Sequence, residues 1–126
     1  MFLVAIALIT LWSNQALTGQ SDQQPPLELT AAADVSAARG VDGALHALSE
    51  KVTSCVTGGR APEACRCAYP KELTDLRVAY EKTIKAHPAW TERALSYRYQ
   101  DKDGQPLSGL LVMPTLRRQL DRMTCE

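Results

Sequence analysis

Apolar residues recur at helical spacing between residues 41 and 56. At about 100° per residue they fall within a stripe about 120° wide, which is typical of an amphipathic helix. The stripe consists of Val41, Ala44, Leu45, Leu48, Val52, Cys55 and Val56. We expect Asp42 or Ser36 to cap the start of this helix and Gly58-Gly59 to end it. The pattern leaves open whether residues 31–39 form an earlier helix that is broken at Gly40.

Two further helices are predicted, each opening near a proline, a residue favoured in the first turn. Residues that follow Pro70 at intervals of three or four line one face, namely Leu73, Leu76, Tyr80, Ile84 and His87. Pro88 disfavours helical geometry at the preceding residue, so this helix should end at His87. A shorter apolar stripe follows Pro114 and consists of Leu116, Leu120 and Met123.

Between these helices the apolar pattern changes to strict alternation. Residues 94–100 alternate apolar and polar side chains, which predicts a strand, and Asp103-Gly104 is the pair that a two-residue hairpin turn prefers. A turn centred there pairs Leu95 with Val112, Tyr97 with Leu110 and Tyr99 with Ser108, and puts both apolar sets on one face. The chain is therefore expected to be mainly α with a small β-hairpin, an α+β fold with about three helices.

The first 21 residues carry no charged side chain, and residues 2–12 are almost entirely apolar. A helix of that length extends only about 16 Å, roughly half of a bilayer core, and it fits the apolar core of a secretory signal peptide. No lysine or arginine precedes the apolar run, which keeps an uncleaved anchor or a buried N-terminal helix as alternatives. We expect a signal peptide at 1–21, a polar Gln/Pro-rich spacer at 22–30 and a single small domain at 31–126.

The four cysteines are Cys55, Cys65, Cys67 and Cys125. An even number in a short chain that looks exported implies two disulfides. Cys65 and Cys67 flank one residue and cannot easily bridge each other. One of them should therefore pair with Cys55 and the other with Cys125, in either assignment. The alternative is thiol-redox or metal-handling chemistry at Cys65-Arg66-Cys67, but the spacing does not match the usual zinc knuckles.

The formal net charge is zero, which argues against a nucleic-acid binder that depends on positive charge. Residues 22–59 carry five acidic and two basic side chains, whereas residues 60–126 carry nine acidic and twelve basic ones. A basic second part is compatible with a docking surface. The residues predicted to form it are Trp90, Arg117, Arg118 and Arg122. The competing interpretation is a solvated helix face for the arginines and a tryptophan that covers the helix–hairpin junction.

No catalytic motif of the serine-hydrolase, zinc-protease or P-loop type occurs in the sequence, and no catalytic residue, metal or cofactor is predicted. His46 is expected in solvent and His87 at a helix end. Residues 101–104 lack the later acidic ligand of a calcium loop. We expect a periplasmic or secreted non-enzymatic protein that binds another envelope or extracellular protein as an inhibitor, accessory subunit or assembly factor. Membrane contact is expected only if the N-terminal segment stays uncleaved. An enzyme of another type, such as a hydrolase, is a further alternative.

Overall fold

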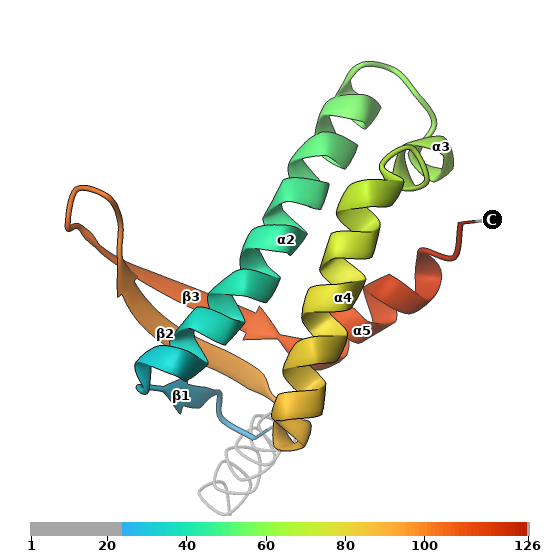
Figure 1. Cartoon of the computed structure of the whole chain (residues 1–126). Helices are drawn as coiled ribbons and strands as arrows, with labels where there is room; N and C mark the ends of the chain where they lie inside the picture. The colour runs from blue at the N-terminus through green and yellow to red at the C-terminus, as the bar shows by residue number, and fades with distance from the viewer. Residues whose placement is uncertain (1–23, 126) are drawn as a thin grey trace, which may run out of the picture.

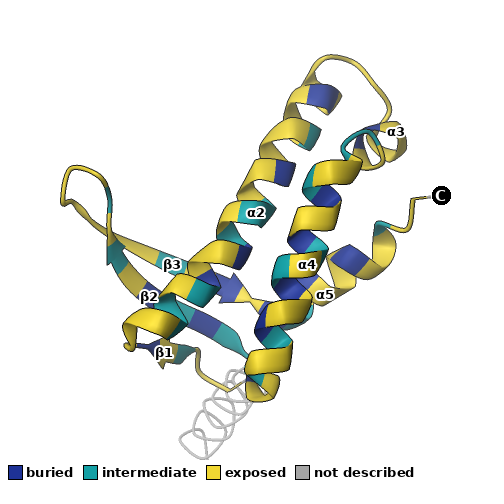
Figure 2. Ribbon diagram, in the orientation of Figure 1, coloured by how far each residue is buried: buried dark blue, intermediate teal, exposed yellow. Residues whose placement is uncertain are grey.

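Two long antiparallel helices form one side of the molecule. In the computed structural model, which describes residues 24–125, α2 (Ala32–Thr57) packs along α4 (Pro70–Ala86) (Figure 1). Figure 2 shows buried residues on the side of each helix that faces the other elements and exposed residues on the opposite side. The predicted signal peptide at 1–21 lies outside the described residues. The architecture is the expected α+β type, mainly helical with a small sheet.

Helix α2 is continuous through Gly40, which answers the question that the apolar pattern left open. Ala38, Val41 and Leu48 are all buried, so the apolar spacing extends back into the first turns of the helix. A glycine inside a helix costs only about 1 kcal/mol relative to alanine, and burial of one or two large apolar side chains exceeds this cost.

The C-terminal end of α2 agrees with the prediction, whereas its N-terminal end does not. The helix begins at Ala32, before both predicted caps, and has no side-chain cap; the assignment of Ser36 or Asp42 as cap was wrong. At the other end Gly58 is the C-cap, and Gly59 has a φ of 100°, a left-handed value that glycine adopts without strain.

Proline is the first residue of each of the next three helical segments. They are α3 (Pro62–Arg66), α4 and the 3₁₀ turn η1 (Pro88–Trp90). The apolar face of α4 is buried as predicted, with Leu73, Leu76 and Tyr80 in the core. His87 ends the helix, because the proline that follows it excludes helical geometry.

In the described part of the chain, the sheet has three strands in the order β1 (Leu27–Leu29), β2 (Ala94–Gln100) and β3 (Pro106–Val112). Strand β1 runs parallel to β2 and was missed, because residues 22–30 were expected to be a spacer. Leu29 is buried in the core and Leu27 packs against it, so the folded part begins in the predicted spacer. A three-residue strand that pairs with residues more than sixty positions away leaves little local pattern to detect.

The hairpin forms as predicted, but its register is shifted by one residue. Leu95 pairs with Leu111, Tyr97 with Gly109 and Tyr99 with Leu107. The Asp101 carboxylate accepts the amides of Asp103 and Gln105 at 2.8 and 2.9 Å, and the Asp101 amide donates to the Gln105 carbonyl. The connection is therefore a three-residue loop with Gly104 at a φ of 78°, not a two-residue turn.

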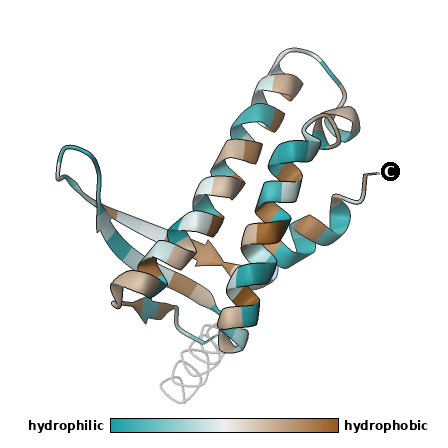
Figure 3. Ribbon diagram, in the orientation of Figure 1, coloured by the Kyte–Doolittle hydropathy of each residue, from teal (hydrophilic) through white to brown (hydrophobic). Residues whose placement is uncertain are grey.

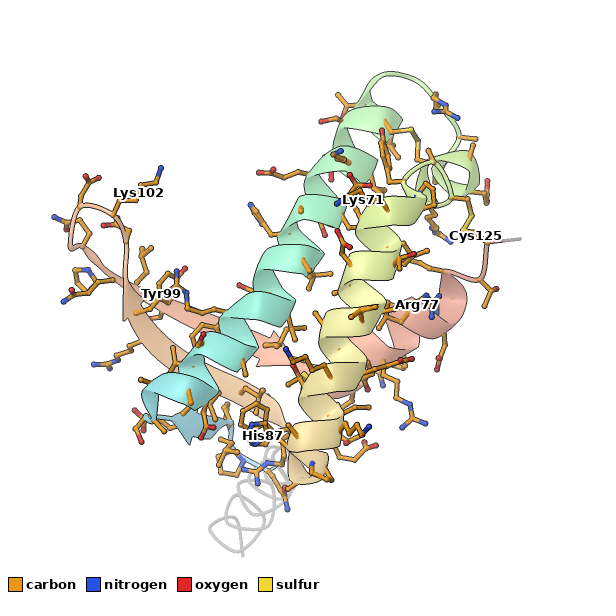
Figure 4. All side chains as sticks on the ribbon, viewed as in Figure 1. Lys71, Arg77, His87, Tyr99, Lys102 and Cys125 are labelled. Carbon is orange, nitrogen blue, oxygen red and sulfur yellow. A yellow bond between two sulfur atoms is a disulfide. The ribbon has the colours of Figure 1, made fainter. Side chains whose placement is uncertain are left out.

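Helix α5 (Met113–Arg122) follows β3 directly and buries Leu116 and Leu120 as predicted. The Cys55–Cys65 disulfide joins the end of α2 to α3, and the Cys67–Cys125 disulfide joins the residue after α3 to the tail behind α5. This is one of the two assignments that the spacing allowed. Figure 4 shows Cys125 next to the α3 region.

Candidate functional site

Strand β3 lies at an edge of the sheet, and within residues 24–125 it pairs only with β2. In an antiparallel ladder, positions that bond the partner strand alternate with positions whose backbone groups point the other way. The Asp101 amide donates to the Gln105 carbonyl, and the Met113 amide donates to the Arg93 carbonyl at 3.1 Å. The odd-numbered positions of β3 therefore bond β2, and the N–H and C=O groups of Ser108, Leu110 and Val112 point to the open edge.

The same three residues place their side chains on the face of the sheet that α2 does not cover. Leu95, Tyr97 and Leu111 point toward the helices and are buried, so their neighbours along each strand point outward. Leu110 is 60% exposed, and Val112 is exposed beside it. Figure 3 shows that β3 becomes hydrophobic toward its end, whereas the hairpin tip is hydrophilic. We call Ser108, Leu110 and Val112 the β3 edge.

A shallow cleft of about 480 Å³ lies at the end of the β3 edge. Its lining comes from the outer face of the sheet, the start of α5 and the segments before β1 and β2, and consists of Gln24, Glu92, Ala94, Val112, Pro114, Thr115 and Arg118. Arg98, on the outward-facing side of β2, is exposed at the other end of the same face. Arg98 lies opposite Ser108 in the β2–β3 ladder and lines a separate cleft with the start of α2, whereas Arg118 lines the cleft at Val112.

The predicted binding residues do not form one surface. Arg118 borders the β3 edge, whereas Arg117 points to Glu92 at an Nη1–Oε1 distance of 3.5 Å and lines a different cleft. Arg122 is exposed in the last turn of α5. Tertiary structure separates these neighbours because consecutive helical positions differ by about 100° in direction.

Trp90 is buried and does not belong to the exposed surface on which it was predicted. Its exposed fraction is 5%, and its ring stacks on His87 with the ring centroids 3.7 Å apart. The ring covers the junction between α4 and the sheet, which was the competing interpretation. His87, at the end of α4 in Figure 4, also lies 3.7 Å from the Asp34 carboxylate. His46 is in solvent next to Glu50, as expected.

Cys65 and Cys67 are both oxidised in disulfides, so Cys65-Arg66-Cys67 carries no free thiol among the described residues. Within residues 24–125, no group of three or more His, Cys, Asp or Glu side chains is arranged to hold a metal ion. No helix in this part of the chain is both long and apolar enough to cross a bilayer.

The β3 edge was missed because the predicted register assigned Leu110 and Val112 to the inner face. A visible signal was the absence of charge from Gly104 to Leu116, which spans the whole of β3. Exposed edge strands usually carry charges or a proline that block pairing with another chain, and β3 has Pro106 at its first position but no charge. In comparisons with known proteins, no family model, no curated protein and no solved structure matches this chain.

Proposed function

We propose that this chain is an exported, non-enzymatic protein that binds a protein partner in the periplasm or outside the cell. In this proposal an extended segment of the partner adds to the sheet along the β3 edge. The two disulfides support export, because such bonds persist in oxidising compartments. The observation that carries the proposal is an edge strand of seven residues with outward backbone groups, no charge and an exposed leucine.

Strand addition would use both the outward backbone groups and the exposed apolar side chains of the β3 edge. Main-chain hydrogen bonds to the outward groups of Ser108, Leu110 and Val112 supply affinity, and alternate side chains of the partner supply specificity. Pro106 lacks an N–H, so the first position of β3 accepts but does not donate. The cleft next to Val112 is large enough to take a side chain of the added strand.

The charges around the β3 edge favour a partner segment whose outer-face residues are apolar at its centre and acidic toward its ends. Arg118 lines the cleft at Val112, Arg98 lies opposite Ser108 in the β2–β3 ladder, and both side chains are exposed. Carboxylates on the partner would pair with these two guanidinium groups, which give charge-assisted hydrogen bonds. Apolar side chains of the partner would cover Leu110 and Val112. Glu92 also lines the cleft and is the acidic group that such a partner must avoid.

The probe for a test is a peptide as long as β3 whose same-face positions are aspartate at both ends and valine between them, with threonine at the alternate positions. The matched peptide carries lysine in place of aspartate. We expect the acidic peptide to protect the amides of Leu110 and Val112 from hydrogen exchange. Ser108→Pro removes one outward N–H and leaves the bonds to β2 intact, so it should weaken binding about five- to tenfold. Ser108→Ala keeps the N–H and is the control.

The partner itself is sought by photocrosslinking in cell envelopes from position 110 and, as control, from the exposed position 50. A protein that is crosslinked from position 110 alone and lost in Ser108→Pro, but not in Ser108→Ala, supports the proposal. Crosslinks to a second copy of this chain, or equal binding of both peptides and both Ser108 variants, contradict it.

A further inference from the structure

A second cleft, of about 350 Å³, lies between α4, α5 and the turn after η1, away from the β3 edge. It is lined by Arg77, Tyr80, Glu81, Ile84, Thr91, Arg117, Leu120 and Asp121. Ile84 and Leu120 make its apolar part, and two cationic and two anionic side chains surround them. Its volume lies at the small end of the roughly 300–1,000 Å³ range of ligand pockets.

The hydroxyl of Tyr80 is the unusual group in this cleft. Tyr80 is 6% exposed, and within residues 24–125 its hydroxyl is buried without a hydrogen-bond partner. Buried hydroxyls nearly always have a partner, because an unmet one costs free energy. Burial raises the pKa of Tyr80, and the charges of Arg117 and Asp121 also act on it. Tyr80, Arg117 and Asp121 all line this cleft.

The other polar groups of the cleft differ in how far they are already engaged. Arg77, which extends from α4 toward α5 in Figure 4, donates through Nη2 to the carbonyls of Leu120 and Met123 at 2.8 and 2.7 Å. The Thr91 hydroxyl donates to the Pro88 carbonyl. Among residues 24–125, the one ion pair of Arg117 is the long, exposed contact with Glu92, which leaves most of its donors available to a ligand.

We propose that this cleft binds a small zwitterion with an aliphatic side chain, of the type of a free α-amino acid. The ligand carboxylate accepts from the Tyr80 hydroxyl and the Arg117 guanidinium. The ligand ammonium donates to the carboxylates of Asp121 and Glu81, and the aliphatic part contacts Ile84 and Leu120. The lining carries two positive and two negative side chains, which matches a ligand of zero net charge. This site is separate from the β3 edge, and the Arg117–Glu92 contact lies between the two clefts.

The test is a titration of the oxidised chain with leucine, followed by NMR of the Tyr80 ring and the Leu120 methyl groups. Two matched probes lack one charge each, namely 4-methylpentanoate and 3-methylbutylamine. We expect leucine to bind at least about tenfold more tightly than either probe, since each lost pair leaves a charge unmet. Tyr80→Phe and Arg117→Gln should each weaken leucine binding about tenfold, and Arg122→Gln should leave it unchanged.

Tyr80→Phe keeps the ring and removes only the unpartnered hydroxyl, so the variant should fold and be at least as stable as the parent chain. Weaker binding without a loss of stability is a result that a purely structural role of Tyr80 does not produce. Absence of saturable shifts with leucine up to about 50 mM, well above the weakest affinities usually counted as specific, overturns the proposal. Equal binding of leucine and the two probes overturns it as well.

Discussion

Gly109 lies directly opposite Tyr97 in the β2–β3 ladder, and the Tyr97 ring fills the space where a side chain at position 109 would stand. A Cβ added at Gly109 would collide with the outer ring atoms and the hydroxyl of Tyr97. Because Tyr97 is among the most buried side chains of the molecule, the ring has little room to move. The glycine is thus what allows a tyrosine on the inner face of this sheet.

Gly109→Ala should lower the free energy of unfolding by about 1–3 kcal/mol, the usual cost of overpacking a core. Gly43→Ala is the matched control, since position 43 lies in the interior of α2 with nothing near its missing Cβ. That variant should raise stability by about 0.5–1 kcal/mol. Urea unfolding measures the free energy of unfolding of both variants. If the two substitutions change it equally and in the same direction, the Tyr97 ring does not restrict position 109.

The two disulfides should differ in their resistance to reduction. Cys55 and Cys65 are buried, with exposed fractions of 8% and 0%, whereas Cys67 and Cys125 are both exposed. Exchange requires a thiolate to reach a sulfur, so a mild reductant should open Cys67–Cys125 first. Timed alkylation and peptide mass spectrometry measure the order. Labelling of Cys55 or Cys65 before Cys67 would show that access does not control the reaction.

Stability should fall in alkaline solution because of buried tyrosines. Burial raises the pKa of Tyr97 and Tyr80 above the ordinary value of 10.0, and the Asp42 carboxylate adds to the rise at Tyr97. The unfolded chain then loses these protons at lower pH than the folded chain. The stabilisation is complete below about pH 10 and is lost as the pH rises through the folded pKa values.

Tyr97→Phe should therefore flatten the decline in unfolding free energy above about pH 10, relative to the parent chain. Urea unfolding between neutral and strongly alkaline pH measures the slope, and the neutral range of the same variant is its control. A variant with the alkaline slope of the parent chain would assign the decline to other groups.

Arg77 should hold the end of α5, because its guanidinium bonds the carbonyls of Leu120 and Met123 at the end of that helix. Arg77→Leu keeps the aliphatic contacts and should cost about 1.5–3 kcal/mol, the range for hydrogen bonds to charged groups. Amide exchange in residues 120–123 should become faster. Arg118→Leu removes a guanidinium from the same helix without such bonds to carbonyls and should leave exchange there unchanged.

The parts of the fold that the sequence predicts are those set by local signals. Helix α4 has a strong apolar period and prolines at both ends, and Gly58-Gly59 ends α2 wherever the rest of the chain lies. Only one residue separates Cys65 from Cys67, and this spacing reduced the possible disulfide pairings to two. The choice between these two assignments needed the tertiary structure.

The parts that could not be predicted depend on distant contacts or on one side chain. Strand β1 exists because Leu29 fits into the core beside β2. The hairpin register depends on the Asp101 carboxylate, which favours a three-residue loop over the two-residue turn. The one-residue shift in register places Leu110 on the outer face of the sheet instead of the inner face. For this reason the β3 edge could not be predicted from the sequence. The candidate site was therefore less predictable than the helices around it.

The closely spaced Cys65 and Cys67 also determine how the chain carries tension. A force that pulls on both ends of the described chain passes from Cys125 to Cys67, then from Cys65 to Cys55, and along α2 to β1. Helix α4, the hairpin and α5 lie within the ring closed by the second disulfide and do not lie on this path. While the bonds stay oxidised, a partner held on β3 would be attached to a part of the chain that pulling cannot extend.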